Sequence, residues 1–219
     1  MPVHKILILS LVYLFIYANS ALSESKQPQN EKNIKIVMLG DSITAGYGLP
    51  QEEAFPAVAE KILKSKGHQV SLLNAGISGS TSASAVARLK WQLRSKPTHV
   101  FIALGANDGL RGFDVKTTQQ NLEKAIQFCK DKNLGVILAG MKMPPNYGKK
   151  YTADFENTYS KLAKKHSVPF FPFLLEGVAG EKDLNQGDGI HPNKEGQLVI
   201  AGKIADFLEK LIKQGKIKV

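Results

Sequence analysis

Residues 34–48 read Ile-Lys-Ile-Val-Met-Leu-Gly-Asp-Ser-Ile-Thr-Ala-Gly-Tyr-Gly, and this stretch decides the fold. Its first six residues form a short, β-branched apolar run that predicts a buried strand. A helix is predicted from Glu53 to Lys66, so Ser42 falls on a strand-to-helix turn. A hydroxyl at such a turn faces the carboxyl edge of a sheet, where open α/β folds bind their ligands. The alternative is a glycine-rich turn with an incidental serine.

Apolar runs and helical patterns alternate five times along the chain. The predicted strands span 34–39, 70–73, 100–104, 134–139 and 168–171. Three helices are predicted at Glu53–Lys66, Thr117–Lys130 and Lys194–Lys213. A further helix ends before Pro97, and another runs from its cap, Thr152, to Lys165. This alternation predicts an α/β fold with a parallel sheet and helices on both faces. A length of 219 residues, 43% of them hydrophobic, suits one domain.

The first 23 residues form a segment of a different kind. Lys5 precedes an apolar run over 6–18, and small residues follow it as far as Ser23. This order is that of a secretory signal peptide, and the run is shorter than a membrane span needs. We therefore expect 1–23 to be removed on export to the periplasm or medium, 24–33 to be a polar leader, and 34–219 to fold. An uncleaved N-terminal anchor is the alternative.

The charge and the cysteine content of the chain limit which kinds of binding partner we expect. The formal net charge is +10, but the lysines are spread along the chain rather than gathered with aromatic residues, so we expect no nucleic-acid partner. The densest group lies at and after the last helix and consists of Lys203, Lys210, Lys213, Lys216 and Lys218. It is either a solvated helix end or a weak contact for an anionic membrane surface. Cys129 is the only cysteine and is predicted to be a buried structural thiol.

Loops rich in glycine and small polar residues follow three of the predicted strands, at 40–48, 76–82 and 105–112. The loops that follow parallel strands open on the same edge of a sheet, so we expect these three to converge. A fourth loop, Asp188-Gly189-Ile190-His191, leads into the last helix and can close over that edge. The four loops together predict a site.

The side chains of these loops suit nucleophilic catalysis. A serine hydroxyl needs a base to accept its proton, and His191 is the candidate base for Ser42. Asp188, three residues earlier, can hold the other ring nitrogen of that histidine. Candidate donors to an oxyanion are the backbone N–H groups of Ser42 and Gly79 and the side-chain amide of Asn107. Alternatively, the Asp–His pair is a helix-capping turn, and the Asn and Gly are ordinary turn residues.

Two further aspartates, Asp41 and Asp108, lie in these loops, and two roles can be assigned to Asp41. Asp41 either orients the serine loop through hydrogen bonds to its backbone or forms a metal site with Asp108. No histidine or carboxylate cluster in the sequence joins the two, which disfavours a metal. We therefore predict no metal and no cofactor.

Four blocks resemble those of the SGNH (GDSL) hydrolase family: Gly40-Asp41-Ser42, the Gly79 loop, 105–108 and 188–191. They are most similar to its branch of bacterial exported thioesterase I, lysophospholipase L1 and arylesterase. The resemblance implies a three-layer α/β/α sandwich whose five-stranded parallel sheet has flavodoxin-like order. It also implies Ser42 as nucleophile, His191 as base with Asp188 as its partner, and Gly79 and Asn107 in the oxyanion hole. The chain has no Gly-x-Ser-x-Gly sequence, which disfavours an ordinary α/β-hydrolase.

These observations predict an exported, metal-independent serine esterase that forms an acyl-enzyme and acts as a monomer on a small-molecule or lipid acyl ester. Lysophospholipids, acyl thioesters and aryl or alkyl esters are the candidate substrates. Apolar residues at 110–113 and 143–147 predict an acyl groove with Phe113 and Tyr147 as substrate-binding residues. The alternatives are a carbohydrate O-deacetylase of the same family and a non-catalytic flavodoxin-like binding module. The latter is disfavoured because Tyr47, not a P-loop lysine, follows Gly46.

Overall fold

A computed structural model of the chain describes residues 33–218. Its five strands form one parallel sheet in the order β2-β1-β3-β4-β5. The strands are β1 (Ile34–Gly40), β2 (Val70–Gly76), β3 (His99–Ala103), β4 (Gly135–Ala139) and β5 (Phe170–Phe171). This is the flavodoxin-like order, so the predicted topology is confirmed. The predicted signal peptide (1–23) and all but the last residue of the leader (24–33) lie outside the described residues.

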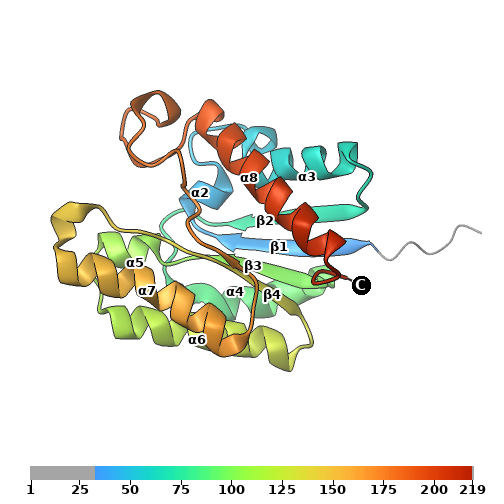
Figure 1. The fold of residues 1–219 in the computed structure, drawn as a ribbon, viewed down its shortest axis with the longest axis horizontal. Helices are drawn as coiled ribbons and strands as arrows, with labels where there is room; N and C mark the ends of the chain where they lie inside the picture. Colours follow the sequence, from blue (N-terminus) through green and yellow to red (C-terminus); the bar gives the residue numbers. More distant parts are fainter. Residues whose placement is uncertain (1–32, 219) are drawn as a thin grey trace, which may run out of the picture. The chain divides into compact units, whose positions relative to one another are not determined.

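Helices cover both faces of the sheet and complete the predicted three layers (Figure 1). One face carries α3 (Phe55–Ser65) and α8 (Lys194–Lys213); the other carries α4 (Ala85–Gln92), α6 (Val115–Asp131) and α7 (Lys149–His166). Two short helices, α2 (Ser42–Ala45) and α5 (Ala106–Leu110), begin just after β1 and β3. Single 3-10 turns occupy Gln51–Glu53, Ser82–Ser84, Leu93–Ser95, Pro145–Tyr147 and Lys182–Leu184.

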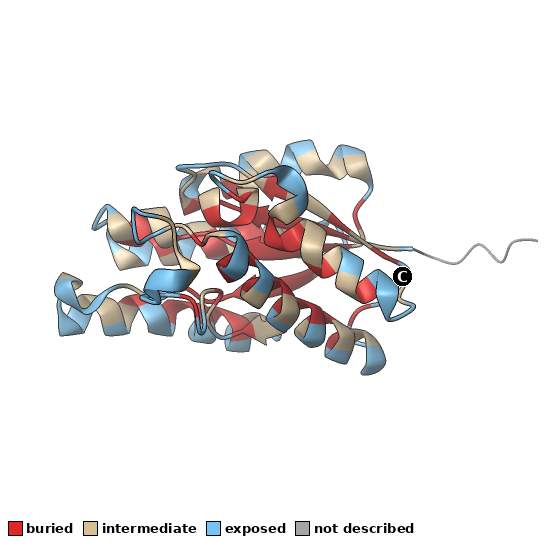
Figure 2. Cartoon of the chain, turned by 90° about the horizontal axis from the view of Figure 1, so that it is seen from above, coloured by how far each residue is buried: buried red, intermediate tan, exposed pale blue. Residues whose placement is uncertain are grey.

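The core lies along the sheet and the inner sides of its helices (Figure 2). β3 is buried at every position, as expected of a central parallel strand covered on both faces. Cys129 of α6 is fully buried there, and its burial raises the pKa of the thiol to about 12, which fits a structural residue. Within 33–218, every helix is too short or too polar to cross a membrane.

Two helices begin earlier than predicted. α6 starts at Val115 rather than Thr117, because the carboxylate of Asp114 accepts a hydrogen bond from the Thr117 N–H (2.9 Å) and so caps the helix two residues upstream. α7 starts at Lys149. Thr152, the predicted cap, instead lies in its first turn and donates its hydroxyl to the carbonyl four residues earlier (3.1 Å).

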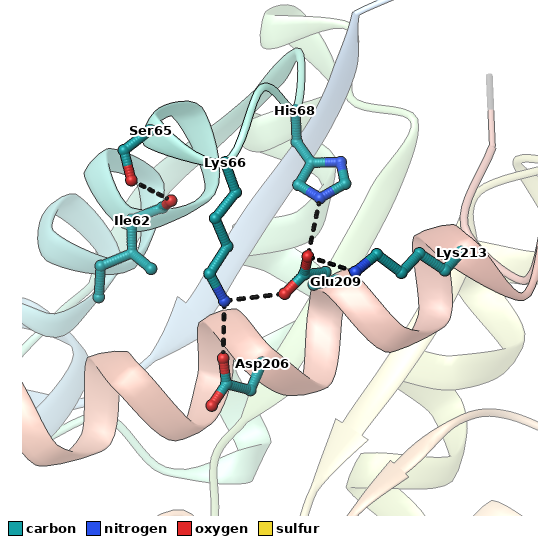
Figure 3. Close-up of polar contacts among 7 residues, drawn as sticks. All are labelled: Ile62, Ser65, Lys66, His68, Asp206, Glu209 and Lys213. Carbon is teal, nitrogen blue, oxygen red and sulfur yellow. Dashed lines mark hydrogen bonds and ion pairs between the residues drawn. The ribbon is translucent and has the colours of Figure 1, made fainter.

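A cluster of charges joins α8 to the end of α3 (Figure 3). The carboxylate of Glu209 lies 2.7 Å from the Lys213 Nζ, 2.8 Å from the Lys66 Nζ and 3.4 Å from the His68 Nε2. Hydrogen bonds from Lys213 and Lys66 lower the pKa of Glu209 to about 2, so this carboxylate remains charged near neutral pH. The cluster therefore helps to fix α8, the helix that follows the His191 loop, against its neighbour.

Candidate active site

Ser42 is the first residue of α2, directly beyond the carboxyl end of β1. The strand order reverses between β1 and β3, and such a reversal is where open α/β sheets bind ligands. The Ser42 Oγ lies 2.9 Å from the His191 Nε2, within hydrogen-bond distance. The structure therefore joins two predicted site residues that are 149 positions apart in the sequence.

The histidine is in turn held by Asp188. Its Nδ1 lies 2.7 Å from the Asp188 Oδ2. The other carboxylate oxygen accepts the backbone N–H groups of Ile190 (2.9 Å) and His191 (3.0 Å). Hydrogen bonds from the backbone and ring of His191 lower the pKa of Asp188 to about 2, so it stays ionised above that pH. The ionised carboxylate of Asp188 favours the His191 tautomer that carries its proton on Nδ1. In that tautomer the lone pair of Nε2 faces Ser42.

Two residues that the sequence analysis missed hold the histidine loop against the serine loop. The side-chain amide of Gln186 donates to the carbonyls of Tyr47 (2.6 Å) and Pro192 (3.1 Å). The Tyr47 ring lies beside the His191 ring, with 4.6 Å between their centroids. The imidazole is therefore positioned by Tyr47 on one side and by Asp188 at its Nδ1. No local sequence pattern pairs these loops, because both contacts depend on the tertiary fold.

A third missed residue, Gln197, supports the serine turn from α8. Its side chain is 1% exposed; its Oε1 accepts the Phe55 N–H (2.7 Å) and its Nε2 donates to the Ile43 carbonyl (3.1 Å). A sequence signal did exist: Gln197 lies on the same buried stripe of α8 as Ala201 and Ile204. A buried amide in such a stripe requires polar partners, which here are the backbones of α2 and α3.

The two remaining oxyanion candidates lie on neighbouring loops that contact one another. The Asn107 Nδ2 donates to the Ser80 carbonyl (3.0 Å), which joins α5 to the loop that follows β2. On that loop Gly79 has a φ of +75°, a left-handed conformation that favours glycine. Arg111 donates to the Gly79 carbonyl (3.2 Å), whereas the Gly79 N–H has no backbone acceptor among residues 33–218. This N–H and one hydrogen of the Asn107 amide are therefore available to a ligand.

The structure favours the orienting role for Asp41 over a metal site. Asp41 is 1% exposed, and its Oδ1 accepts the Ile43 N–H (3.0 Å) as the N-cap of α2. Asp108 binds Ser82 instead, through both of its carboxylate oxygens. Among residues 33–218, no three His, Cys, Asp or Glu side chains are grouped closely enough to hold a metal ion.

The burial of Asp41 predicts a stability that depends on pH. Desolvation raises the pKa of Asp41 from 3.8 to about 6, against the opposing effect of the Ile43 hydrogen bond. The folded state thus binds the proton of the Asp41 carboxyl more tightly than the unfolded chain does. The protonated form therefore stabilises the fold; this contribution is complete below pH 4 and is lost as the pH rises through 6. Asp41→Asn imitates the protonated carboxyl, so we expect its urea midpoint to match that of the wild type at pH 4 and to exceed it at pH 8. A difference that does not widen between these pH values would contradict the prediction.

An apolar cavity of about 450 Å³ opens beside these residues. Its walls come from α2, α5 and three loops and consist of Ile43, Ala106, Leu110, Lys142, Met143, Pro144, Pro145, Phe173, Leu175, Ala179, Gly180, Asn185, Gly189 and Ile190. Ile43, Ala106 and Ile190 are sequence neighbours of Ser42, Asn107 and His191, so the cavity adjoins the polar groups described above. Lys142 is its one charged lining residue within 33–218, and it pairs with Glu156 (3.1 Å).

The two predicted groove residues do not line this cavity, so their part in substrate binding stays a prediction. The predicted loops do contribute walls, through Leu110 and 143–145, but Phe113 and Tyr147 border a separate hollow beside 148–151. The Tyr147 hydroxyl donates to the Leu110 carbonyl (2.8 Å), which fixes the ring there. The prediction also missed the wall formed by 173–180, although the apolar residues of this segment directly follow β5.

Comparisons with known proteins agree with this geometry. Residues 38–199 match the model of the GDSL-like lipase/acylhydrolase family. An arylesterase of Vibrio mimicus is 40% identical over 204 residues, which cover 93% of this chain and 98% of that protein. The thioesterase 1/protease 1/lysophospholipase L1 of Escherichia coli strain K12 is 40% identical over 178 residues, which cover 81% and 84%.

A solved structure is similar over the same region. The psychrotrophic esterase EstA from Pseudoalteromonas sp., inhibited by monoethylphosphonate, superimposes with a TM-score of 0.79 at 37% identity. The match covers 83% of this chain and 100% of that one. The resemblance predicted from the four sequence blocks is thereby confirmed. The chain belongs to the GDSL-like lipase/acylhydrolase family, the SGNH hydrolases, and is an enzyme of the hydrolase class.

Proposed function

We propose that this protein is a serine esterase that hydrolyses acyl esters through a covalent acyl-enzyme. The observation that carries the proposal is the continuous contact from Ser42 Oγ to His191 Nε2 (2.9 Å) and from His191 Nδ1 to Asp188 Oδ2 (2.7 Å). A hydroxyl, an imidazole and a carboxylate joined in this way form the arrangement that activates a serine nucleophile.

In the proposed reaction, His191 accepts the hydroxyl proton as the Ser42 Oγ attacks the substrate carbonyl carbon. The carbonyl oxygen becomes an oxyanion, which the N–H groups of Ser42 and Gly79 and the amide of Asn107 stabilise. When the intermediate collapses, the C–O or C–S bond breaks and His191 gives its proton to the leaving group. Water, with His191 again as base, then cleaves the acyl-enzyme. Asp188 remains ionised throughout and stabilises the imidazolium.

The apolar cavity supports an acyl chain longer than acetyl. Ligand sites of small molecules commonly enclose about 300–1,000 Å³ behind mostly apolar walls, and the cavity beside Ser42 has about 450 Å³. We propose that the acyl chain lies there, with the leaving group toward solvent. The relatives are named as an arylesterase and a thioesterase/lysophospholipase, which differ in the leaving group but share an acyl part. Small aryl and alkyl esters, lysophospholipids and acyl thioesters are therefore the proposed substrates.

We further propose that the protein is exported, since the first 23 residues read as a signal peptide, and that it acts as a monomer. The C-terminal lysines could form the proposed contact with a membrane surface. Lys210 and Lys213 lie in the last turn of α8, a 20-residue helix whose other end adjoins His191, and Lys216 and Lys218 follow that turn. Such a helix is about 30 Å long. A contact of these lysines with an anionic lipid surface stays a proposal, and it would turn the catalytic edge away from the lipid.

The test of the proposed function is hydrolysis of p-nitrophenyl acetate, octanoate and palmitate by protein produced without residues 1–23, with a chelator present. We expect octanoate to give a higher kcat/KM than acetate, because its chain removes apolar wall from water. Silence on all three esters would contradict the proposal, whereas activity confined to acetate would favour the O-deacetylase alternative.

The position of the acyl chain predicts a change in specificity. Ala179 is an exposed alanine on the cavity wall, so Ala179→Trp should fill space that an octanoyl chain needs. We expect the octanoate-to-acetate ratio of kcat/KM to fall about tenfold or more, the cost of losing roughly two buried methylenes at ~0.8 kcal/mol each. The matched control is Ala87→Trp, the same change at an exposed position of α4 that does not line the cavity. Equal ratios in the two variants would contradict the placement.

A further inference from the structure

A buried carboxylate, Asp108, links the two loops that carry the proposed oxyanion donors. It is 2% exposed and directly follows Asn107 in α5. Its Oδ2 accepts the Ser82 N–H (2.8 Å) and its Oδ1 accepts the Ser82 hydroxyl (2.5 Å). A buried carboxyl group that accepts both the N–H and the hydroxyl of one residue holds that residue in place. Asp108 therefore joins the Asn107 turn to the loop that bears Gly79, three residues before Ser82.

Two side chains of helix α6 also contact the Asp108–Ser82 pair. The Asn121 side-chain amide donates to the Ser82 Oγ (3.1 Å), and the Thr118 hydroxyl lies 3.4 Å from the Asp108 Oδ1. The direct partners of the buried carboxyl group are Ser82 of the loop and Thr118 of α6, and its burial is costly unless such hydrogen bonds satisfy it. The network thus ties the Asn107 turn and the Ser82 loop to one helix, α6.

The other links between the two loops are less suited to this task. Arg111, which donates to the Gly79 carbonyl, is exposed to solvent. The bond from Asn107 to the Ser80 carbonyl uses the same amide that would bind the oxyanion. The Asp108–Ser82 link is buried and leaves both donors free. Donors act on a transition state only when they are held in place before the reaction, within about 0.5 Å.

We propose that Asp108 is a positioning residue that holds Gly79 and Asn107 in a single oxyanion-binding arrangement. The inference rests on the proposed esterase function. It assigns to Asp108 an effect on the transition state, exerted through its neighbours, rather than contact with the substrate. Loss of the link should therefore lower kcat and leave KM almost unchanged, because the acyl cavity does not include Asp108 or Ser82.

The experiment compares Asp108→Ala, Asp108→Asn and the control Asp114→Asn with the wild type on p-nitrophenyl octanoate. Asp114 is also an aspartate that binds a nearby N–H, but it caps α6 and does not contact the oxyanion loops. We expect kcat to fall about 100-fold in Asp108→Ala, the loss typical of one oxyanion donor. Asp108→Asn retains one acceptor and should lose less. Asp114→Asn should keep kcat within about twofold, even if its Tm falls.

A second readout separates positioning from general damage to the fold. A trifluoromethyl ketone with a hexyl chain forms an oxyanion-like adduct with serine, whereas octanoic acid occupies only the acyl cavity. In the Asp108 variants, affinity for the ketone should fall in proportion to kcat/KM, and affinity for octanoic acid should not change. A wild-type kcat in Asp108→Asn, or equal losses for both ligands, would overturn the inference. If Asp108→Ala does not fold, Asp108→Asn decides. Ester hydrolysis that persists in Ser42→Ala would instead refute the proposed function itself.

Discussion

Replacement of Ser42 by alanine is expected to lower kcat on p-nitrophenyl octanoate by about a millionfold, the loss seen when a catalytic serine is removed from such a triad. The Ser42 Oγ is the atom that lies 2.9 Å from the imidazole, and alanine offers no group in its place that can attack the carbonyl. The measurement is single-turnover and steady-state hydrolysis with purified protein.

The fold itself should tolerate this change. The hydrogen bond of the Ser42 side chain is to His191, whereas the turn is held by Asp41 and Gln197. We therefore expect the Tm of Ser42→Ala to stay within about 2 °C of the wild type, since surface-accessible substitutions rarely change stability by more than about 0.5 kcal/mol. A variant that is folded and retains a tenth of the activity would show that Ser42 is not the nucleophile.

The second large effect is expected for His191→Ala, with a loss in kcat similar to that of Ser42→Ala. In the proposed triad the two residues act as a unit, so the double variant should be no worse than either single one. Asp188→Asn should cost less, roughly 10⁴-fold, because an amide disturbs the tautomer of His191 without removing it. A double-variant loss equal to the product of the single losses would mean that the two residues act independently, contrary to the proposed triad.

The pH profile offers an independent check of these roles. Because the pKa of Asp188 is lowered to about 2, its protonation cannot limit activity between pH 4 and 9. An acid limb of kcat/KM within that range should therefore have another origin than Asp188, whereas Asp188→Asn should lower the height of the whole profile.

Much of the fold could be predicted from local patterns. The β-branched run before Gly40 and the all-apolar strand before Gly105 are typical of central parallel strands, and the right-handed crossover rule then allows few arrangements. The weakest element, β5, comprises only Phe170–Phe171, because the preceding Pro169 has no N–H to donate to a neighbouring strand. The start of α6 was missed because a side chain upstream, that of Asp114, supplies the cap, whereas α7 begins at Lys149 without a side-chain cap.

Less of the candidate site than of the fold could be predicted from the sequence. Ser42, Asn107, Asp188 and His191 lie on loops that must share one sheet edge, so their meeting followed from topology. The cavity did not follow, because its walls combine loops whose side chains cannot be oriented from sequence alone. The Tyr147 hydroxyl, for example, donates to the carbonyl of Leu110, 37 residues distant, and the residue borders a different hollow. Contacts such as this depend on the packed structure and have no local signature.

The most direct test of the central claim is covalent labelling with an alkyl fluorophosphonate, read by intact-protein and peptide mass spectrometry. The Ser42 Oγ should attack phosphorus and displace fluoride, because His191 accepts its proton and the oxyanion donors face the phosphoryl oxygen. We expect one adduct per chain, located on the peptide that contains Ser42, and none in Ser42→Ala or His191→Ala. An active enzyme that takes no label, or a label on any other residue, would contradict it.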